Sequence, residues 1–512
     1  MSELPVNFVE SIDDAPRPPI DFEDQSPRQR VVRNTIFLTI GQIVGVPLSV
    51  LANAITARYL GPAAFGYMYL GSSFNTFGFL VVEWGLGGVL PALVAADRAR
   101  AGALLGTSVV WRCISALAMY PVLIGLCRLL GYSSEVRMVV TLFFIGYTIS
   151  AVSNAGQWVM IGFERAEVAA YRQILEQMAV LVIVIPILML GGTLNAALVG
   201  HAVVTVLVLL YIGYALRSVN LNGLSVDVGT LKTILRRGTP FVFMALAMTF
   251  QPGIDAAFLS KLAPAEVVGW HSAARRLVGF LIFPASALVG ALYPTLCRLH
   301  ATDLEAFKRM TASALRGTSL LVIPVSLGCL LYPDIGIAFY DRGLFQPAEQ
   351  NLRVLSLFVF LLYFTMPLGI SVLASGRQRE WTLVQSSCVI TSLALDPLLV
   401  PVFQRRMGNG GLGIAVATLV SEAVVLCCGV WLAPRGIFGR QFWRSLVPAL
   451  AAGAAMVVVA GFLRPMTSFI AAPIAVTAYV ACLWMTGGLD ESFISELRRL
   501  AASKLSRLRR AS

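Results

Sequence analysis

The first long apolar stretch of this chain ends in ARYLGPAAFGY, residues 57–67. Farther along, another apolar stretch ends in SKLAPAEVVGW, residues 260–270. When Gly66 is aligned with Gly269, further positions fall together: Arg58 with Lys261, Tyr67 with Trp270, and Arg33 with Arg236. A dozen matched positions can arise by chance, but the matched order of whole segments around them favours an internal duplication. Transporters are often built from such repeats, with the substrate site between them.

The composition places the chain in a membrane. Hydrophobic residues make up 57% and charged residues 13%, against a charged share of about 25% in soluble domains. Stretches of about 20 apolar residues recur along nearly the whole length, and each can span a bilayer as a helix. These stretches lack the strict alternation that a membrane-spanning barrel requires. The sequence therefore predicts an all-α polytopic membrane protein.

The apolar stretches predict about 14 transmembrane helices, arranged as two pseudo-symmetric six-helix bundles around a central cavity plus two C-terminal helices. The predicted spans lie near 34–56, 65–95, 102–127, 137–162, 167–190, 194–216, 239–260, 265–297, 312–333, 351–375, 382–403, 411–433, 444–462 and 468–487. The corresponding division is a disordered cytoplasmic tail (1–33), an N-terminal bundle (34–216), a cytoplasmic linker (217–238), a C-terminal bundle (239–433), two additional helices (434–487) and a basic amphipathic cytoplasmic tail (488–512). A frayed tail is the alternative for the last segment.

Charge gives the orientation. Most of the 39 Lys and Arg residues fall in segments assigned to one side, including Arg236-Arg237, Lys308-Arg309 and the run over 498–510. By the positive-inside rule both termini are cytoplasmic, although Arg405-Arg406 on a predicted external loop runs against the rule. The net charge of +12 then reflects topology and contact with anionic lipid headgroups. It does not call for a nucleic-acid partner.

Signatures of catalysis are absent from the sequence, so an enzyme is not expected. There is no GxxxxGK[ST] phosphate loop, no HExxH and no paired-aspartate metal motif. His201, His271 and His300 are scattered over different segments. The longest predicted external loop, about 333–352, is short for a glycan polymerase. No cofactor is expected beyond a coupling proton or sodium ion.

The corner motifs carry a resemblance. Residues 57–67 resemble the ARxLGPxxFGxY signature of Wzx-type polysaccharide and lipid-linked oligosaccharide flippases, and residues 254–273 resemble their second-half segment "iDxxfLgk…vGxYsaA". Pro264-Ala265 departs from the usual Gly-centred corner. These proteins belong to the multidrug/oligosaccharidyl-lipid/polysaccharide (MOP) exporter superfamily. The resemblance, over about residues 30–490, implies two six-helix bundles around a cavity and a place in the bacterial cytoplasmic (inner) membrane.

Charged side chains inside spans are the best candidates for a functional site, because each costs about 2.5–3.5 kcal/mol or more at a helix centre. The predicted substrate-binding residues are cationic: Arg275, Arg276, Arg58, Lys261 and Arg112. The predicted ion-coupling residues are acidic: Asp255, Glu83, Asp396 and Glu422. For Arg58 and Lys261, near the external ends, snorkelling to headgroups is the competing interpretation. For the acidic residues and Arg112, buried ion pairs are the alternative.

The pair Arg275-Arg276 is the sharpest of these signals. A helix that begins near Ala265 puts the pair about 15 Å into the bilayer. Neighbouring helical residues point about 100° apart, so at least one arginine should face a wet interior, where a guanidinium fork suits a diphosphate. An internal ion pair with Asp255 is the competing explanation.

Three functions remain open at this stage. The first is a flippase that moves an undecaprenyl-diphosphate-linked glycan across the membrane by ion-coupled alternating access, with a polysaccharide polymerase or export machinery as possible partner. The second is an ion-coupled drug exporter of the multidrug and toxic compound extrusion kind. A lipid II flippase or a membrane glycan polymerase is the third. Arginine inside a cavity-lining helix favours an anionic, lipid-linked substrate.

Overall fold

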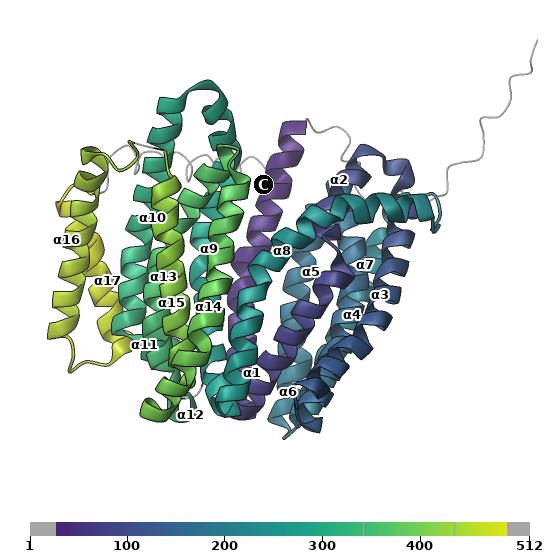
Figure 1. The fold of residues 1–512 in the computed structure, drawn as a ribbon, viewed down its shortest axis with the longest axis horizontal. Helices are drawn as coiled ribbons and strands as arrows, with labels where there is room; N and C mark the ends of the chain where they lie inside the picture. The colour runs from purple at the N-terminus through teal and green to yellow at the C-terminus, as the bar shows by residue number, and fades with distance from the viewer. Residues whose placement is uncertain (1–26, 341, 435, 489–512) are drawn as a thin grey trace, which may run out of the picture.

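The computed structural model describes residues 27–340, 342–434 and 436–488 (Figure 1). These residues form helices and connections, with no strand among them. Within them, twelve helical segments are long and apolar enough to cross a membrane. The predicted fold class, an all-α polytopic membrane protein, is confirmed. The predicted tails fall mostly on residues 1–26 and 489–512, outside the described residues.

Two successive sets of helices make up most of the molecule. The N-terminal half consists of α1 (Pro27–Glu83), α2 (Leu86–Ala96), η2 (Arg98–Arg100), α3 (Ala101–Leu129), α4 (Ser134–Gly162), α5 (Ala166–Ala179), η3 (Val180–Val184), α6 (Ile185–Met189) and α7 (Leu194–Leu216). The C-terminal half consists of α8 (Val228–Leu262), α9 (Ala265–Thr302), α10 (Leu304–Leu331), α11 (Pro333–Ile337), α12 (Arg342–Phe345), α13 (Ala348–Ala374), α14 (Gln378–Met407) and α15 (Gly410–Leu432). Two further helices, α16 (Arg440–Phe462) and α17 (Ser468–Met485), follow.

Helix α1 is two spans joined at a corner. Its 57 residues are interrupted at Gly61, where φ is +75° and ψ is 171°. An unbroken helix of that length would be roughly 85 Å long, far more than a bilayer core of about 30 Å. Glycine tolerates this positive φ without the steric cost of a Cβ. Counting α1 as two spans, and adding α8, brings the described segments to fourteen, close to the number that the sequence predicts.

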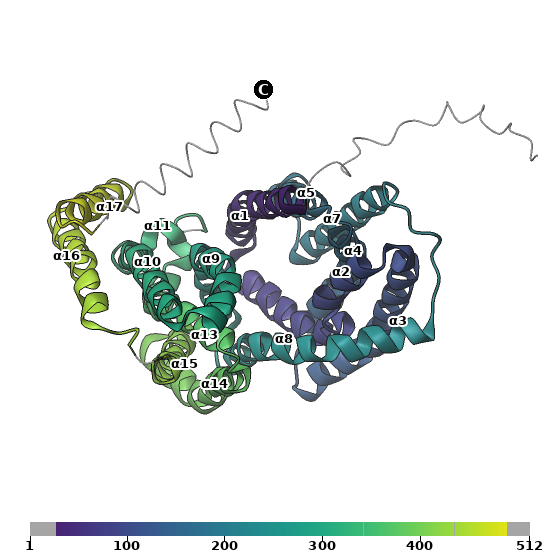
Figure 2. The same cartoon turned by 90° about the horizontal axis from the view of Figure 1, so that it is seen from above.

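Helix α8 begins earlier than expected. The sequence predicts a linker up to residue 238, whereas α8 starts at Val228, capped by Asp227, whose side chain accepts bonds from the backbone N–H groups of Gly229 and Thr230. The first turns of α8 pack on the N-terminal half. Trp84 donates from Nε1 to the carbonyl of Leu235 at 3.1 Å. Figure 2 shows α8 running from the C-terminal half across toward α3.

The two halves meet through a pair of glycines, one from each. A Cβ on Gly66 would lie 2.2 Å from the carbonyl oxygen of Ala265, and a Cβ on Gly269 would lie 2.0 Å from the carbonyl oxygen of Pro62. When Gly66 is aligned with Gly269, Pro62 aligns with Ala265, so the two contacts are equivalent. Reciprocity of this kind is the mark of a two-fold axis. The duplication predicted from the sequence is therefore seen in space, and we call this contact the glycine crossing.

Aromatic side chains close the same end of the molecule. The fully buried ring of Phe65 packs edge-on against Tyr340 and Phe345, at centroid distances of 6.0 and 6.2 Å. On the other side of the crossing, the hydroxyl groups of Tyr132 and Ser260 lie 2.7 Å apart. The halves are thus held together at the predicted external end.

Helices α16 and α17 pack on each other and, in the C-terminal half, against α10. In Figure 2 they lie at the edge farthest from α3 and α4. They have no counterpart in the N-terminal half, so they break the two-fold symmetry of the described helices.

Candidate functional site

A cavity of about 290 Å³ lies between the two halves, and we call it the arginine cavity. Its wall is made by residues of α1, α8 and α9: Tyr69, Ser72, Ser73, Thr76, Thr249, Pro252, Gly253, Arg275 and Arg276. Helix α9 begins at Ala265, as predicted, so the two arginines lie about 15 Å along it. The structure thus brings both arginines to the wall of one cavity.

Arg276 joins the halves below the glycine crossing. It donates from Nη1 to Oδ1 of Asn53, and its guanidinium carbon lies 5.1 Å from the centroid of the Phe65 ring. Nε of Arg276 is buried and has no acceptor among the described residues. Unmet donors on a buried guanidinium are costly, so an acceptor that reaches the cavity would be held firmly.

Arg275 faces the C-terminal half. Its guanidinium carbon lies 5.4 Å from the centroid of the Phe358 ring, and it lies within electrostatic range of Asp255 and Glu422. Among the described residues, neither Arg275 nor Arg276 makes an ion pair within 4.0 Å. The direct bridge to Asp255 that the sequence offered as an alternative is not formed in this conformation.

Two of the predicted ion-coupling residues are neighbours. Asp255 of α8 and Asp396 of α14 are 3% and 0% exposed, and their carboxyl groups act on each other electrostatically. No described donor is assigned to Asp255 Oδ1 or to either oxygen of Asp396. Two buried carboxylates that act on each other repel when both are ionised. Glu422 is also buried, but no set of three acidic, His or Cys side chains among the described residues is close enough to hold a metal ion.

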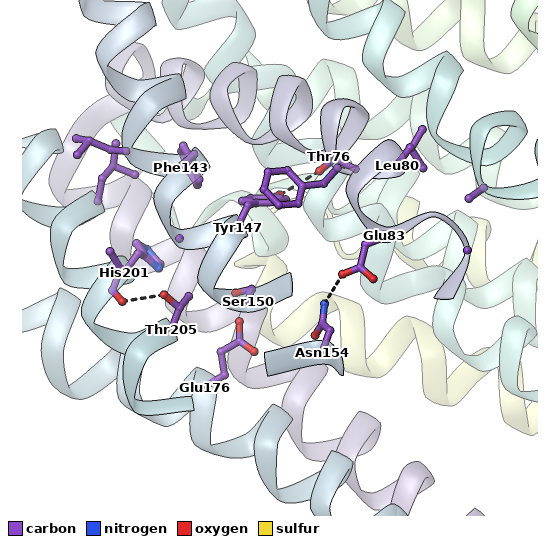
Figure 3. A pocket seen from close by; sticks show the side chains of 17 residues that line it. Thr76, Leu80, Glu83, Phe143, Tyr147, Ser150, Asn154, Glu176, His201 and Thr205 are labelled. Carbon is purple, nitrogen blue, oxygen red and sulfur yellow. Dashed lines mark hydrogen bonds between the residues drawn. The ribbon is translucent and has the colours of Figure 1, made fainter. Parts of the chain in front are cut away.

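A second cavity, of about 510 Å³, lies inside the N-terminal half, and we call it the N-half pocket (Figure 3). Its labelled polar residues include Glu83 and Asn154 on one side, and His201 and Thr205 on the other. Tyr147 extends toward Thr76, and their hydroxyl groups lie 3.0 Å apart. Thr76 also lines the arginine cavity, so the two cavities adjoin.

Arg112 and Glu83 form a buried ion pair at the wall of this pocket. Nη2 of Arg112 lies 2.7 Å from Oε2 of Glu83, and the Arg112 side chain is 0% exposed. Nδ2 of Asn154 donates to Oε1 of Glu83 at 3.0 Å. Arg112 thus lies behind Glu83 and lines neither cavity. For these two residues the structure forms the ion pair that the sequence left as the alternative.

The two remaining predicted cations lie apart from both cavities. Arg58 is exposed near the corner at Gly61. Lys261 is exposed as well, with Nζ 3.6 Å from the centroid of the Tyr132 ring. Of the predicted substrate-binding residues, the structure brings together Arg275 and Arg276.

Sequence reasoning missed most of the N-half pocket. Its polar residues recur at helical spacing within apolar spans: Tyr147, Ser150 and Asn154 on α4, and His201 and Thr205 on α7. Such a spacing of three or four residues places side chains on one helix face. A stripe of polar residues on one face of an apolar span was therefore the sequence pattern that could have identified this pocket, including His201.

The comparisons with known proteins agree with this architecture. The family described as polysaccharide biosynthesis protein matches residues 31–300. The lipid II flippase MurJ, in an inward closed conformation, overlaps with a TM-score of 0.70 at 13% identity, covering 89% of this chain and 99% of that one. An inward-facing multidrug resistance MATE family transporter of the MOP superfamily gives 0.64 at 19% identity, covering 78% and 97%. An outward-facing structure of a transporter of that kind gives 0.51 at 19% identity, covering 80% and 95%.

No curated protein matches the chain. The structural likenesses, all at low identity, show the fold. The family match covers more than half of the sequence and includes the corner motif at residues 57–67 together with its counterpart at 260–270. The chain therefore belongs to the polysaccharide biosynthesis protein family.

Proposed function

We propose that the protein is a flippase for a lipid-linked glycan. The sugar–diphosphate head group of an undecaprenyl-type carrier would cross the membrane between the two halves, while the lipid tail stays in the bilayer. The observation that carries this proposal is the pair Arg275-Arg276 in the wall of the arginine cavity. A planar guanidinium donates two parallel hydrogen bonds to a phosphate, which an ammonium cannot do.

The energetic cost of this pair supports a functional role. Each cation costs several kcal/mol at the membrane centre, and neither has a carboxylate within 4.0 Å among the described residues. Aromatic faces, from Phe65 and Phe358, meet only part of that cost. An anionic head group would supply the missing counter-charge during transport.

We further propose that Asp255 and Asp396 form the coupling site. Their carboxyl groups take up a proton or a sodium ion, and Arg275, which acts electrostatically on Asp255, links that event to the arginine cavity. Glu422, also within range of Arg275, belongs to the same electrostatic unit. Release of the ion would strengthen the pull of the carboxylates on Arg275 and so weaken its hold on the substrate.

The test is a set of single variants in cells that depend on this protein for surface glycan. Arg275→Ala or Arg276→Ala should abolish export at normal membrane abundance, and Arg→Lys should restore it only in part. Arg298→Ala, at the other end of α9, is the matched control and should export normally. Full export by a stable Arg275→Ala/Arg276→Ala protein would sink the diphosphate role.

If the pair is instead a structural partner of Asp255, each alanine variant should lose abundance, and adding Asp255→Ala should restore it. Depletion of the wild-type protein identifies the cargo, because the carrier lipid that accumulates bears the glycan. Accumulation of lipid II would assign the protein to peptidoglycan synthesis.

A drug exporter is the second candidate, since two carboxylates, Glu83 and Glu176, line the N-half pocket. Lipophilic cations would be attracted by such charges. Export of tetraphenylphosphonium from cells, lost in Glu83→Gln, with normal surface glycan in both strains, would establish that function in place of the first. The cationic cavity wall favours the anionic lipid.

Place and partners follow as proposals from the same function. A carrier-linked glycan is assembled at the cytoplasmic face, so we place the protein in the bacterial inner membrane with both termini inside. The product at the outer leaflet is the substrate of a polysaccharide polymerase or export machinery, which would be the partner. Cross-linking in intact cells tests that partnership.

A further inference from the structure

The N-half pocket is left without a role by the diphosphate proposal. We propose that it binds the neutral sugar ring attached directly to the diphosphate, while Arg275 and Arg276 hold the phosphates. This inference rests on the proposed flippase function. It names the chemical class of the first sugar, an uncharged hexose or acetamido sugar.

The charges of the pocket argue for a neutral ligand. No Lys or Arg side chain lines it. Its two carboxylates are already paired at the back: Glu83 with Arg112 at 2.7 Å, and Glu176 with Arg172 at 3.7 Å. A phosphate or a uronic acid would meet carboxylates without a facing cation. A neutral polyol would meet hydrogen-bond acceptors and donors.

The lining has two kinds of group, each complementary to one kind of surface on a sugar ring. Tyr147, Phe143 and Phe79 supply aromatic faces for the C–H face of a pyranose. Asn154, Ser150 and Thr205 supply amide and hydroxyl groups for its equatorial hydroxyls. The labelled side chains point into one shared space in Figure 3, from α1, α4, α5 and α7. The volume, about 510 Å³, lies in the range of about 300–1,000 Å³ typical of small-molecule pockets.

The connection to the arginine cavity fixes which part of the substrate fits. Thr76 lies in the wall of both cavities, so a group in the N-half pocket is next to a group at the arginines. A glycosyl diphosphate joins a neutral ring to an anion by a single bond. The division of the walls into an aromatic, cation-free pocket and a cationic cavity matches that division of the ligand.

Gly146 offers a substitution that fills the pocket with little other change. It lies on α4 in the pocket wall, and a Cβ built there meets no heavy atom within 4 Å. Gly146→Leu should project into the space that the sugar would occupy, and it removes a glycine from a helix interior, which favours the fold. Gly125→Leu is the matched control, since Gly125 is also helical and also has open space around its Cβ, on α3 away from the pocket.

The experiment measures binding to the purified full-length protein in nanodiscs. The probes are farnesyl diphosphate, and the same lipid carrying N-acetylglucosamine or glucuronic acid. Wild type should bind the N-acetylglucosamine probe roughly tenfold more tightly than bare farnesyl diphosphate, the order expected from two or three net hydrogen bonds. Gly146→Leu should remove that gain and leave bare farnesyl diphosphate unchanged, whereas Gly125→Leu should behave as wild type. The glucuronic acid probe should show no gain.

The failures of the two proposals are distinguishable. An unchanged sugar gain in Gly146→Leu, or an equal gain for glucuronic acid, would overturn the sugar pocket and leave the flippase proposal standing. Absence of diphosphate binding in wild type would overturn the flippase proposal itself. Binding of tetraphenylphosphonium that Gly146→Leu abolishes, together with no sugar gain, would assign the pocket to lipophilic cations.

Discussion

At the scale of single residues, the ion pair between Arg112 and Glu83 should be sensitive to substitution of either partner. Arg112 is fully buried, and its Nε and Nη1 atoms have no acceptor among the described residues. Glu83 is the group that compensates its charge. Removing one partner of such a pair leaves a charge stranded in a medium of low dielectric constant.

Glu83→Ala should therefore lower the free energy of unfolding by about 3–5 kcal/mol. Glu83→Gln keeps an oxygen acceptor for Arg112 and should cost less. The double variant Glu83→Ala/Arg112→Met removes the stranded charge and should recover most of the loss. Thermal unfolding of the purified protein in detergent measures all three, and equal midpoints for Glu83→Ala and wild type would show that the pair contributes nothing.

Asp396 gives a second residue-scale prediction, which concerns coupling. Asp396→Asn keeps the shape of the side chain but can no longer exchange a proton or neutralise a cation beside Asp255. Transport of a glycan lipid in proteoliposomes should then become insensitive to imposed proton and sodium gradients. Asp303→Asn, at the exposed N-terminus of α10, is the control and should retain the dependence. A gradient response that survives in Asp396→Asn would place the coupling site elsewhere.

At the scale of helices, the N-terminus of α8 depends on one carboxylate. The side chain and backbone N–H of Thr230, with the backbone N–H of Gly229, hold the pKa of Asp227 below its ordinary value of 3.8. A lowered pKa means that the folded state favours the ionised form. This stabilisation is complete at pH values above the ordinary pKa and is lost as the pH falls through the lowered pKa.

The thermal unfolding midpoint of wild type should therefore decrease as the pH is lowered below about 4, and Asp227 should account for part of that decrease. Asp227→Asn retains a side-chain oxygen for the cap but has no titrating group, so it should lose less stability over that acid range. Parallel pH series of the two proteins in detergent provide the measurement. Superimposable curves would contradict the assignment.

The glycine crossing is the second feature at this scale. An alanine at Gly66 would place its Cβ 2.2 Å from a carbonyl oxygen of α9, so the helices must separate. Overpacking of this kind costs about 1–3 kcal/mol, enough to shift the population toward a state open at that end. Gly279→Ala is the control: Gly279 lies on α9, a Cβ there meets no heavy atom within 4 Å, and the substitution should leave the population unchanged.

The readout is a cysteine at Thr76 in a variant without the eight native cysteines, labelled from outside intact cells with an impermeant maleimide. Labelling should rise severalfold in Gly66→Ala. Labelling at the rate of the parent would show that the crossing does not close the outer end.

At the scale of the whole molecule, the orientation is directly testable. Reporter fusions at Ser225 and Ser512 should behave as cytoplasmic, and one at Asn409, in the turn between α14 and α15, should behave as external. An external signal at Ser225 would break the division into two six-helix halves, because the connection between them would then lie on the wrong side.

Much of this architecture could be predicted from the sequence. Hydropathy located the spans, since a bilayer imposes both length and composition, and the alignment of Gly66 with Gly269 anticipated the two residues that meet at the axis. Composition did not reveal how each helix is rotated about its own axis, and therefore which of its side chains face a cavity. For that reason the sequence ranked Arg112 as a ligand for substrate, whereas it pairs with Glu83. It also could not show that Asp255 and Asp396, far apart in the chain, share one site.

The glycine crossing also has a consequence for how the protein is made. Its two strictly small residues are separated by roughly 200 residues, and ribosomes add about 5–20 residues per second, so roughly 10–40 s pass between their synthesis. During that interval the first half sits in the bilayer before its partner exists. Until α9 is made, the surface at Gly66 has no helix backbone packed against it. The surface at Gly66 must therefore be compatible with lipid during synthesis and with a packed helix afterwards.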